Sequence, residues 1–193
     1  MATVYASFRE TPFFPESFQT TVGECPKNRD FPAHRRPILV RDEASWFAGQ
    51  LLDLHEAPLA QTGAGQPTLR FSMLNGGART VTVRVTEVKG GRLHLTAKWL
   101  PGSAVCADKQ GCVVEKLLSP SEQARLEAAV APFLAAPSYG CDGAVDAGVS
   151  VLEASQGDTY RIWHQRSRPT DDVRAAGHAF LQLAGWPLAD ELR

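Results

Sequence analysis

Between Thr68 and Trp99 the chain alternates apolar and polar residues, with the two-residue period of strands that place one face on a core. The first predicted strand is 68–74, and the Asn75-Gly76-Gly77 sequence after it is a turn signal. The alternation resumes over 81–86 and 92–99, around a second turn at Lys89-Gly90-Gly91, and a further strand is predicted over 112–118. This segment therefore predicts an antiparallel meander.

Helix signals and a second hairpin surround the meander. A helical period indicates a helix over 42–56, with Asp42 as a possible N-cap. Ser119-Pro120-Ser121-Glu122 has the form of a capping box that starts a second helix. Residues 149–154 and 158–165 read as a hairpin, 138–148 as a loop, and 171–184 as a last helix that ends at Gly185. The prediction is an α+β fold with about three helices, as a single domain over 41–193.

Residues 1–40 are predicted to form an extended arm rich in phenylalanine and proline. Five prolines exclude a long helix and disfavour a central strand. Disordered tails are poor in aromatic residues, whereas this arm contains Phe8, Phe13, Phe14, Phe18 and Phe31. The arm is therefore expected to lie over the core with its rings inserted, or to act as a strip that binds a partner.

Charge and hydropathy limit the partners. The net charge of -1 argues against a generic nucleic-acid binder, because such proteins usually carry a basic excess. No run of about 18 apolar residues is present, so no membrane span is expected. The first residues do not show the pattern of a secretory signal, which leaves a cytoplasmic protein or a mature exported form as alternatives.

Four cysteines bear on the compartment. Cys106 and Cys112 bracket a short polar loop, and a disulfide between them would leave Cys25 and Cys141 as the second pair by elimination. Four cysteines allow three pairings, and four free thiols are the other possibility. The even number in polar surroundings favours an oxidising compartment, and the absence of metal-ligand spacing argues against zinc.

Motifs for catalysis are weak. The chain has no phosphate-binding loop and no GxSxG elbow, and its histidines are not spaced as metal ligands, so no cofactor or metal is expected. Asp142 and Glu153 would form a pair of carboxylates for acid/base hydrolysis if both faced one cleft. Cys141 beside His164 is a second possible catalytic pair.

A basic patch is the candidate binding surface. The polar positions of the meander carry Arg84, Arg92, His94 and Lys98, which suits an acidic protein partner. Asp142 and Asp146 lie on the acidic loop between the second predicted helix and the second hairpin, and they are included in this candidate contact set.

Short motifs between residues 45 and 186 resemble a family of uncharacterised secreted proteobacterial proteins. Its members are small, non-enzymatic α+β proteins, and some occur where toxin–immunity pairs would be expected; the four cysteines and the Phe-rich arm depart from its pattern. The resemblance implies a secreted or periplasmic accessory protein and identifies no catalytic residue. The matching pieces are Leu54-His55-Glu56, Leu69-Arg70-Phe71, Leu117 to Glu122, Asp142-Gly143, Val151 to Ala154, Gly157 to Tyr160, Arg168-Pro169 and Phe180 to Gly185.

These observations lead to a functional expectation. The protein is expected to be a non-enzymatic, periplasmic inhibitor of the immunity type, a monomer or small oligomer that occludes the active site of a bacterial effector, such as one of the type VI secretion system. The alternatives are a hydrolase that uses Asp142, Glu153 or Cys141, and a cell-envelope accessory protein without a toxin partner. A cytoplasmic location remains the alternative to the periplasm.

Overall fold

The computed structural model describes residues 12–27, 32–62, 65–74, 80–100, 112–143, 148–166 and 169–186, and it confirms the α+β class. The helices are η1 (Glu16–Gln19, a 3-10 helix), α2 (Arg41–Asp53), α3 (Leu59–Thr62), α4 (Pro120–Ala135) and α5 (Asp171–Leu183). The strands are β1 (Val22–Cys25), β2 (His34–Pro37), β3 (Thr68–Leu74), β4 (Val81–Val88), β5 (Arg92–Trp99), β6 (Cys112–Leu117), β7 (Tyr139–Cys141), β8 (Val149–Gln156) and β9 (Thr159–Arg166).

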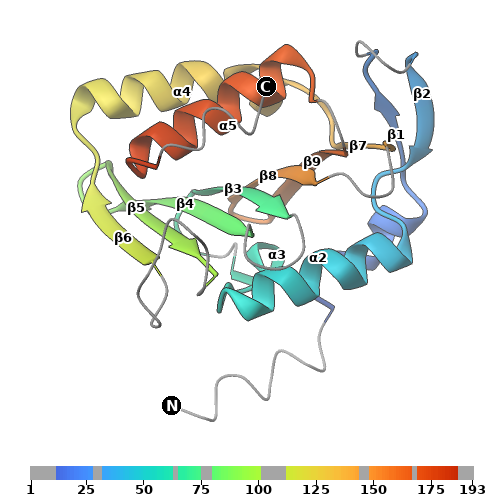
Figure 1. The fold of residues 1–193 in the computed structure, drawn as a ribbon, viewed down its shortest axis with the longest axis horizontal. Helices are drawn as coiled ribbons and strands as arrows, with labels where there is room; N and C mark the ends of the chain where they lie inside the picture. Colours follow the sequence, from blue (N-terminus) through green and yellow to red (C-terminus); the bar gives the residue numbers. More distant parts are fainter. Residues whose placement is uncertain are drawn as a thin grey trace.

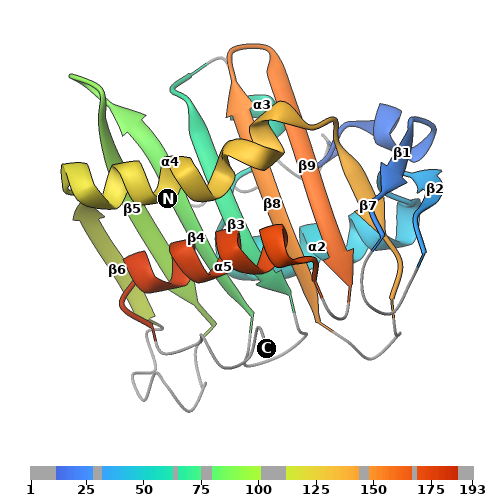
Figure 2. The same cartoon turned by 90° about the horizontal axis from the view of Figure 1, so that it is seen from above.

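One mixed sheet joins the meander to the second hairpin. Its seven strands have the order β6-β5-β4-β3-β8-β9-β7, because β3 pairs antiparallel with β8. The loop expected over 138–148 contains β7, which pairs parallel with β9. Helices α4 and α5 lie across one face of the sheet, and α2 and α3 lie on the other (Figures 1 and 2).

Both faces of the central strands are therefore covered. On the α4/α5 face, Phe71, Val83 and Leu152 share a core with Phe180 of α5. On the opposite face, Leu74, Val151 and Ile162 pack with Phe47 and Leu51 of α2. Polar residues expected to face solvent, such as Ser72 and Thr82, are completely buried for this reason.

Local signals explain where the helices begin and end. Ser119 caps α4, and the Glu122 carboxylate accepts a hydrogen bond from the Ser119 backbone N–H. Hydrogen bonds from Lys116 and then from Ser119 lower the pKa of Glu122 to about 2. Helix α5 ends before Gly185, whose φ of 72° is the left-handed conformation of a C-terminal cap. Helix α2 is the exception, because its N-cap is Val40 rather than Asp42.

The N-terminal segment packs against the body of the fold. Phe13 and Phe14 are buried beside Phe47, and the Phe18 ring stacks on Tyr160. Two short stretches within the expected extended arm form the β1–β2 hairpin, since each strand supplies the other with backbone hydrogen bonds. Phe8 and Phe31 lie outside the described residues. Among the described helices, none has the length and hydropathy needed to cross a bilayer.

Candidate functional site

A buried ion pair connects the two halves of the sheet. Arg70 of β3 and Glu153 of β8 are directly opposite each other in the sheet register. The Arg70 guanidinium donates two hydrogen bonds of 2.6 Å to the Glu153 carboxylate, and both side chains are completely buried. Tyr160 Oη donates a third hydrogen bond to Glu153, at 2.8 Å. The two parallel hydrogen bonds from Arg70, with the one from Tyr160, supply the buried Glu153 carboxylate with donors from within the protein.

Glu56 extends this pair into a larger network. Its Oε2 lies 3.3 Å from the Nη1 atoms of both Arg70 and Arg84, and its Oε1 lies 2.6 Å from Lys98 Nζ. We call Arg70, Glu153, Glu56, Arg84, Lys98 and Tyr160 the Arg70 network. Its three cations face two carboxylates, so the network carries one net positive charge.

The end of α2 explains the position of Glu56. The Glu56 N–H donates to Leu51 O and the His55 N–H donates to Leu52 O, as in a Schellman motif. His55 occupies the left-handed position of this motif, with φ 55°, which is where glycine is usual. The reversal at His55 turns Glu56 under the sheet, where it is only 3% exposed.

Burial and charge set the protonation of the network. Desolvation by burial would lower the pKa of Arg70, but attraction from Glu153 and then Glu56 raises it above its ordinary value. Burial, and secondarily the charge of Glu153, raises the pKa of Tyr160 well above 10. Both groups therefore keep their protons at neutral pH. Arg70 stays positively charged, and Tyr160 stays neutral.

On the side of the sheet that holds the Arg70 network, β5 and β6 present a surface of charged and apolar side chains. Arg92 and His94 of β5 lie at the surface, and His94 is opposite Leu117 of β6 in the sheet register. Leu117 is 46% exposed and Val113 is 59% exposed. We call Arg92, His94, Val113, Glu115 and Leu117 the β5–β6 face.

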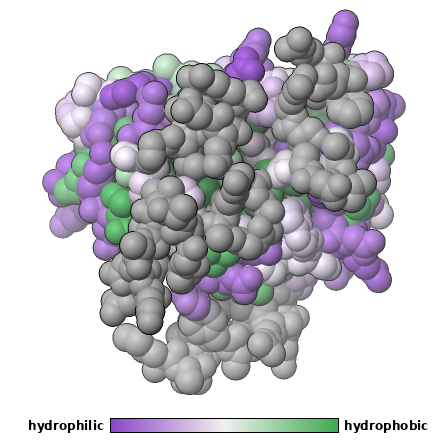
Figure 3. Space-filling view, in the orientation of Figure 1, coloured by the Kyte–Doolittle hydropathy of each residue, from purple (hydrophilic) through white to green (hydrophobic). Residues whose placement is uncertain are grey.

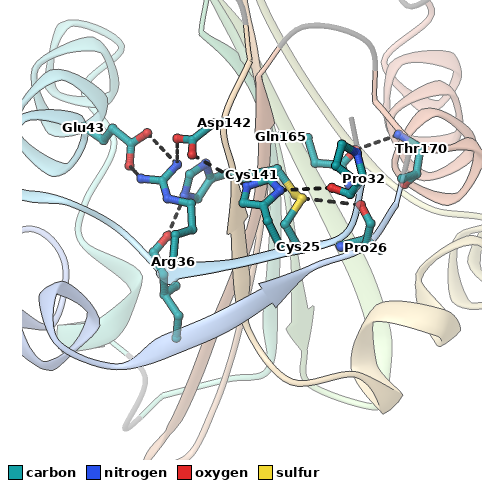
Figure 4. Close-up of a disulfide and its surroundings, with 12 residues drawn as sticks. Cys25, Pro26, Pro32, Arg36, Glu43, Cys141, Asp142, Gln165 and Thr170 are labelled. Atoms are coloured by element: carbon teal, nitrogen blue, oxygen red, sulfur yellow. Dashed lines mark hydrogen bonds and ion pairs between the residues drawn. A yellow bond between two sulfur atoms is a disulfide. The ribbon is translucent and has the colours of Figure 1, made fainter. Parts of the chain in front are cut away.

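A second cluster lies at the opposite edge of the sheet, beside a disulfide (Figure 4). Arg36 of β2 donates to both carboxylate oxygens of Glu43 in α2 and to Asp142 Oδ1, at 2.5 Å for the last. His34 Nε2 lies 3.6 Å from Asp142 Oδ2. The Cys25–Cys141 disulfide confirms one of the expected pairs and connects β1 to β7. Cys106 lies outside the described residues, so the Cys106–Cys112 pair stays a prediction.

His164 of β9 is buried behind this cluster. Its Nε2 lies 2.6 Å from the Ile38 carbonyl, and its ring meets Phe47 edge to face. Burial is the main cause that lowers the pKa of His164 from 6.5 to about 4. His164 is therefore a neutral core residue at physiological pH.

We expect this histidine to make the fold sensitive to acid. Below pH 6.5 the unfolded chain binds a proton that folded His164 takes up only near pH 4, so its contribution to stability is complete above pH 6.5 and is lost as the pH falls toward 4. The loss approaches about 3 kcal/mol. Urea unfolding of the wild type and of His164→Gln at several pH values measures it. The variant should lose less stability over this interval, and equal losses would contradict the assignment.

The close approach of Ile38 and His164 to β7 leaves no room for a side chain at Gly140. A Cβ at this position would lie 2.1 Å from the Ile38 carbonyl oxygen and 2.3 Å from His164 Nε2. We expect Gly140→Ala to lower the free energy of unfolding by about 2 kcal/mol, because the clash involves a backbone atom. Gly49→Ala, where a Cβ meets nothing within 4 Å, is the matched control for urea unfolding. A Gly140→Ala variant as stable as this control would show that β7 can shift.

The four basic predicted contact residues share one side of the sheet, and Asp142 lies apart from them. Arg84 and Lys98 are 28% and 20% exposed and share Glu56, and Arg92 and His94 lie on the same side of the sheet, on the β5–β6 face. Asp142 follows β7, five strand positions from β5, or roughly 24 Å along the sheet. Asp146 lies outside the described residues.

The candidate catalytic groups are also separated. Glu153 belongs to the Arg70 network, whereas Asp142 belongs to the Arg36 cluster at the sheet edge. Cys141 is bonded to Cys25 and carries no free thiol. Within the described residues, no group of three or more His, Cys, Asp or Glu side chains converges as a metal site.

Several site residues were missed from the sequence. Arg36 and Glu43 had no motif, Glu56 was named only within the Leu54-His55-Glu56 piece of the family resemblance, and Glu153 was considered only as a partner of Asp142. A signal for the last was available, because pairing 68–74 with 149–156 in one register places Arg70 opposite Glu153. Comparison of the chain with protein-family models and with curated proteins found no match to either.

Proposed function

We propose that the protein is a non-enzymatic, immunity-type inhibitor that binds a bacterial secretion-system effector through its β5–β6 face. The observation that carries this proposal is a row of exposed side chains on β6, in which Leu117 lies opposite His94 of β5 and Val113 lies opposite Lys98. Exposed apolar side chains among polar and charged ones are typical of protein-interaction surfaces, and arginine is enriched among the residues that carry binding energy. Figure 3, in the orientation of Figure 1, shows green apolar atoms set among purple polar ones on the side where β5 and β6 lie.

The surface around these side chains suits an acidic partner. The Arg70 network, which includes Arg84 and Lys98 at the border of the face, carries one net positive charge, and within the face the charge of Glu115 offsets that of Arg92. Because these cations are held on paired strands, a partner meets them in fixed positions. Such a surface steers an acidic active-site rim into contact and fixes its orientation.

Binding accounts for the acidic residues better than hydrolysis does. Glu153 and Glu56 are completely occupied by cations, and Asp142 pairs with Arg36. A general acid or base needs a site that a substrate can reach, and these pairs leave no such site between Asp142 and Glu153. The Cys25–Cys141 disulfide is compatible with an oxidising compartment, so we place the inhibitor in the periplasm as a monomer or small oligomer.

The test uses the secretion-system effectors of the bacterium that produces this chain. Each effector is purified, and its binding and its toxic activity are measured with and without the protein. We expect one effector to be neutralised at equimolar protein. Leu117→Asp should weaken its binding by about tenfold or more, and Arg92→Glu should slow association, most at low salt.

Arg125→Glu provides the matched control, because Arg125 is exposed on α4, on the opposite face of the sheet. This variant should bind as the wild type does. If no effector is bound, the immunity proposal fails and the accessory-protein alternative gains weight. If an effector is bound but the β5–β6 variants and the control behave alike, the assigned face is wrong.

A further inference from the structure

A cavity of about 410 Å³ opens on the α4/α5 face of the sheet, on the opposite side of the sheet from the β5–β6 face. Its floor consists of side chains from four strands, Leu69, Val85, Leu93 and Ala154, and Leu134 near the end of α4 forms a wall. Figure 2 shows that α4 crosses the strands short of their ends, so the strand ends beyond it have no helix above them. The volume lies in the range of small-molecule sites.

The exposed lining is mainly apolar, with uncharged polar residues and one charged group. The uncharged polar residues are Thr68, Ser155, Gln156 and Thr159. Val85 and Ala154 are nearly inaccessible at the bottom, whereas Leu69 and Leu93 are partly exposed and Leu134 is 45% exposed. The remaining lining residues are uncharged except for Arg161 of β9. No acidic side chain lines the cavity among the described residues.

Arg161 is held at the mouth of the cavity. Its Nη1 donates a hydrogen bond of 2.6 Å to the Leu134 carbonyl, which is one of the last carbonyls of α4 and has no partner within the helix. This contact fixes the guanidinium, and its other N–H groups have no hydrogen-bond partner among the described residues. A guanidinium in this position is suited to a carboxylate.

We propose that this cavity binds an amphiphilic carboxylate, with its alkyl chain on the apolar floor and its carboxylate against Arg161. An uncharged apolar ligand would leave the Arg161 donors unused, and a small hydrophilic anion would leave Leu69, Leu93 and Leu134 in water. Only a ligand with both parts satisfies the charge and the apolar surface together. The site is independent of the proposed inhibitor function, because it lies on the other face of the sheet.

Isothermal titration of the full chain with octanoate, decanoate and dodecanoate, below their micelle concentrations, tests the proposal. We expect saturable binding at one site that tightens with chain length, and binding of 1-decanol that is weaker than decanoate by about fivefold. Arg161→Gln should weaken decanoate to the affinity of decanol, and Leu134→Glu should abolish binding. Arg92→Gln is the matched control on the opposite face and should leave decanoate binding unchanged.

Three results would overturn the proposal. These are the absence of saturable decanoate binding, equal affinities for decanoate and decanol, and an Arg161→Gln effect no larger than that of Arg92→Gln. Leu134 is a surface residue, so Leu134→Glu is expected to fold, and circular dichroism verifies this. Neutralisation of an effector neither requires nor excludes this site, so failure here leaves the inhibitor proposal intact.

Discussion

Replacing Arg70 with methionine should lower the free energy of unfolding by about 3–5 kcal/mol. The reason is that Glu153 is completely buried and would retain only the Tyr160 hydroxyl as a partner. Glu56 would lose one of its three cations at the same time. A buried carboxylate without a counterion is far more costly than a missing surface pair. Urea unfolding followed by Trp fluorescence measures the effect.

The double variant Arg70→Met/Glu153→Gln is the control for this result. It removes both charges and keeps a side-chain oxygen that accepts from Tyr160, so most of the stability should return. A loss of less than about 1 kcal/mol in Arg70→Met would contradict the burial of the pair, since that is the range of exposed ion pairs.

Removing the disulfide by Cys25→Ser/Cys141→Ser should cost about 4 kcal/mol of stability. The two cysteines are separated by 116 residues, so the bond restricts a large part of the unfolded chain. Reducing agent should remove the same contribution from the wild type. Urea unfolding with and without reductant measures both quantities.

The Cys106→Ser/Cys112→Ser variant isolates the contribution of this bond. Because it retains Cys25 and Cys141, it should remain sensitive to reductant. Mass spectrometry after alkylation of the unfolded, unreduced protein should find no label on Cys25 or Cys141. Labelling of both residues would show that the disulfide is absent and would remove the support for an oxidising compartment.

Local patterns were sufficient to predict most of the secondary structure. The alternation over 68–99 predicted β3 to β5, and the capping box at Ser119 placed the start of α4 at Pro120. Residues close together in the sequence determine these features, so the sequence alone is enough to predict them. The three-residue strand β7 was missed because Tyr139-Gly140-Cys141 is too short to show a period.

Contacts between distant segments explain what the sequence did not reveal. Arg70 and Glu153 are 83 residues apart and meet only because β3 pairs with β8. Glu56 reaches them through a helix end at which histidine occupies the position where glycine is usual. Charged residues on a strand usually face solvent, but α2 and α3 cover that face in the fold. Four cysteines did not specify a pairing either, and the position of β1 beside β7 determined it.

The proposed function requires an effector to bind through the β5–β6 face. Hydrogen–deuterium exchange of the protein, alone and with the effector that it neutralises, tests this proposal. We predict slower exchange on binding in peptides that cover β5 and β6, and no change in peptides from β7. Protection centred on β7 and Asp142, with β5 and β6 unchanged, would contradict it.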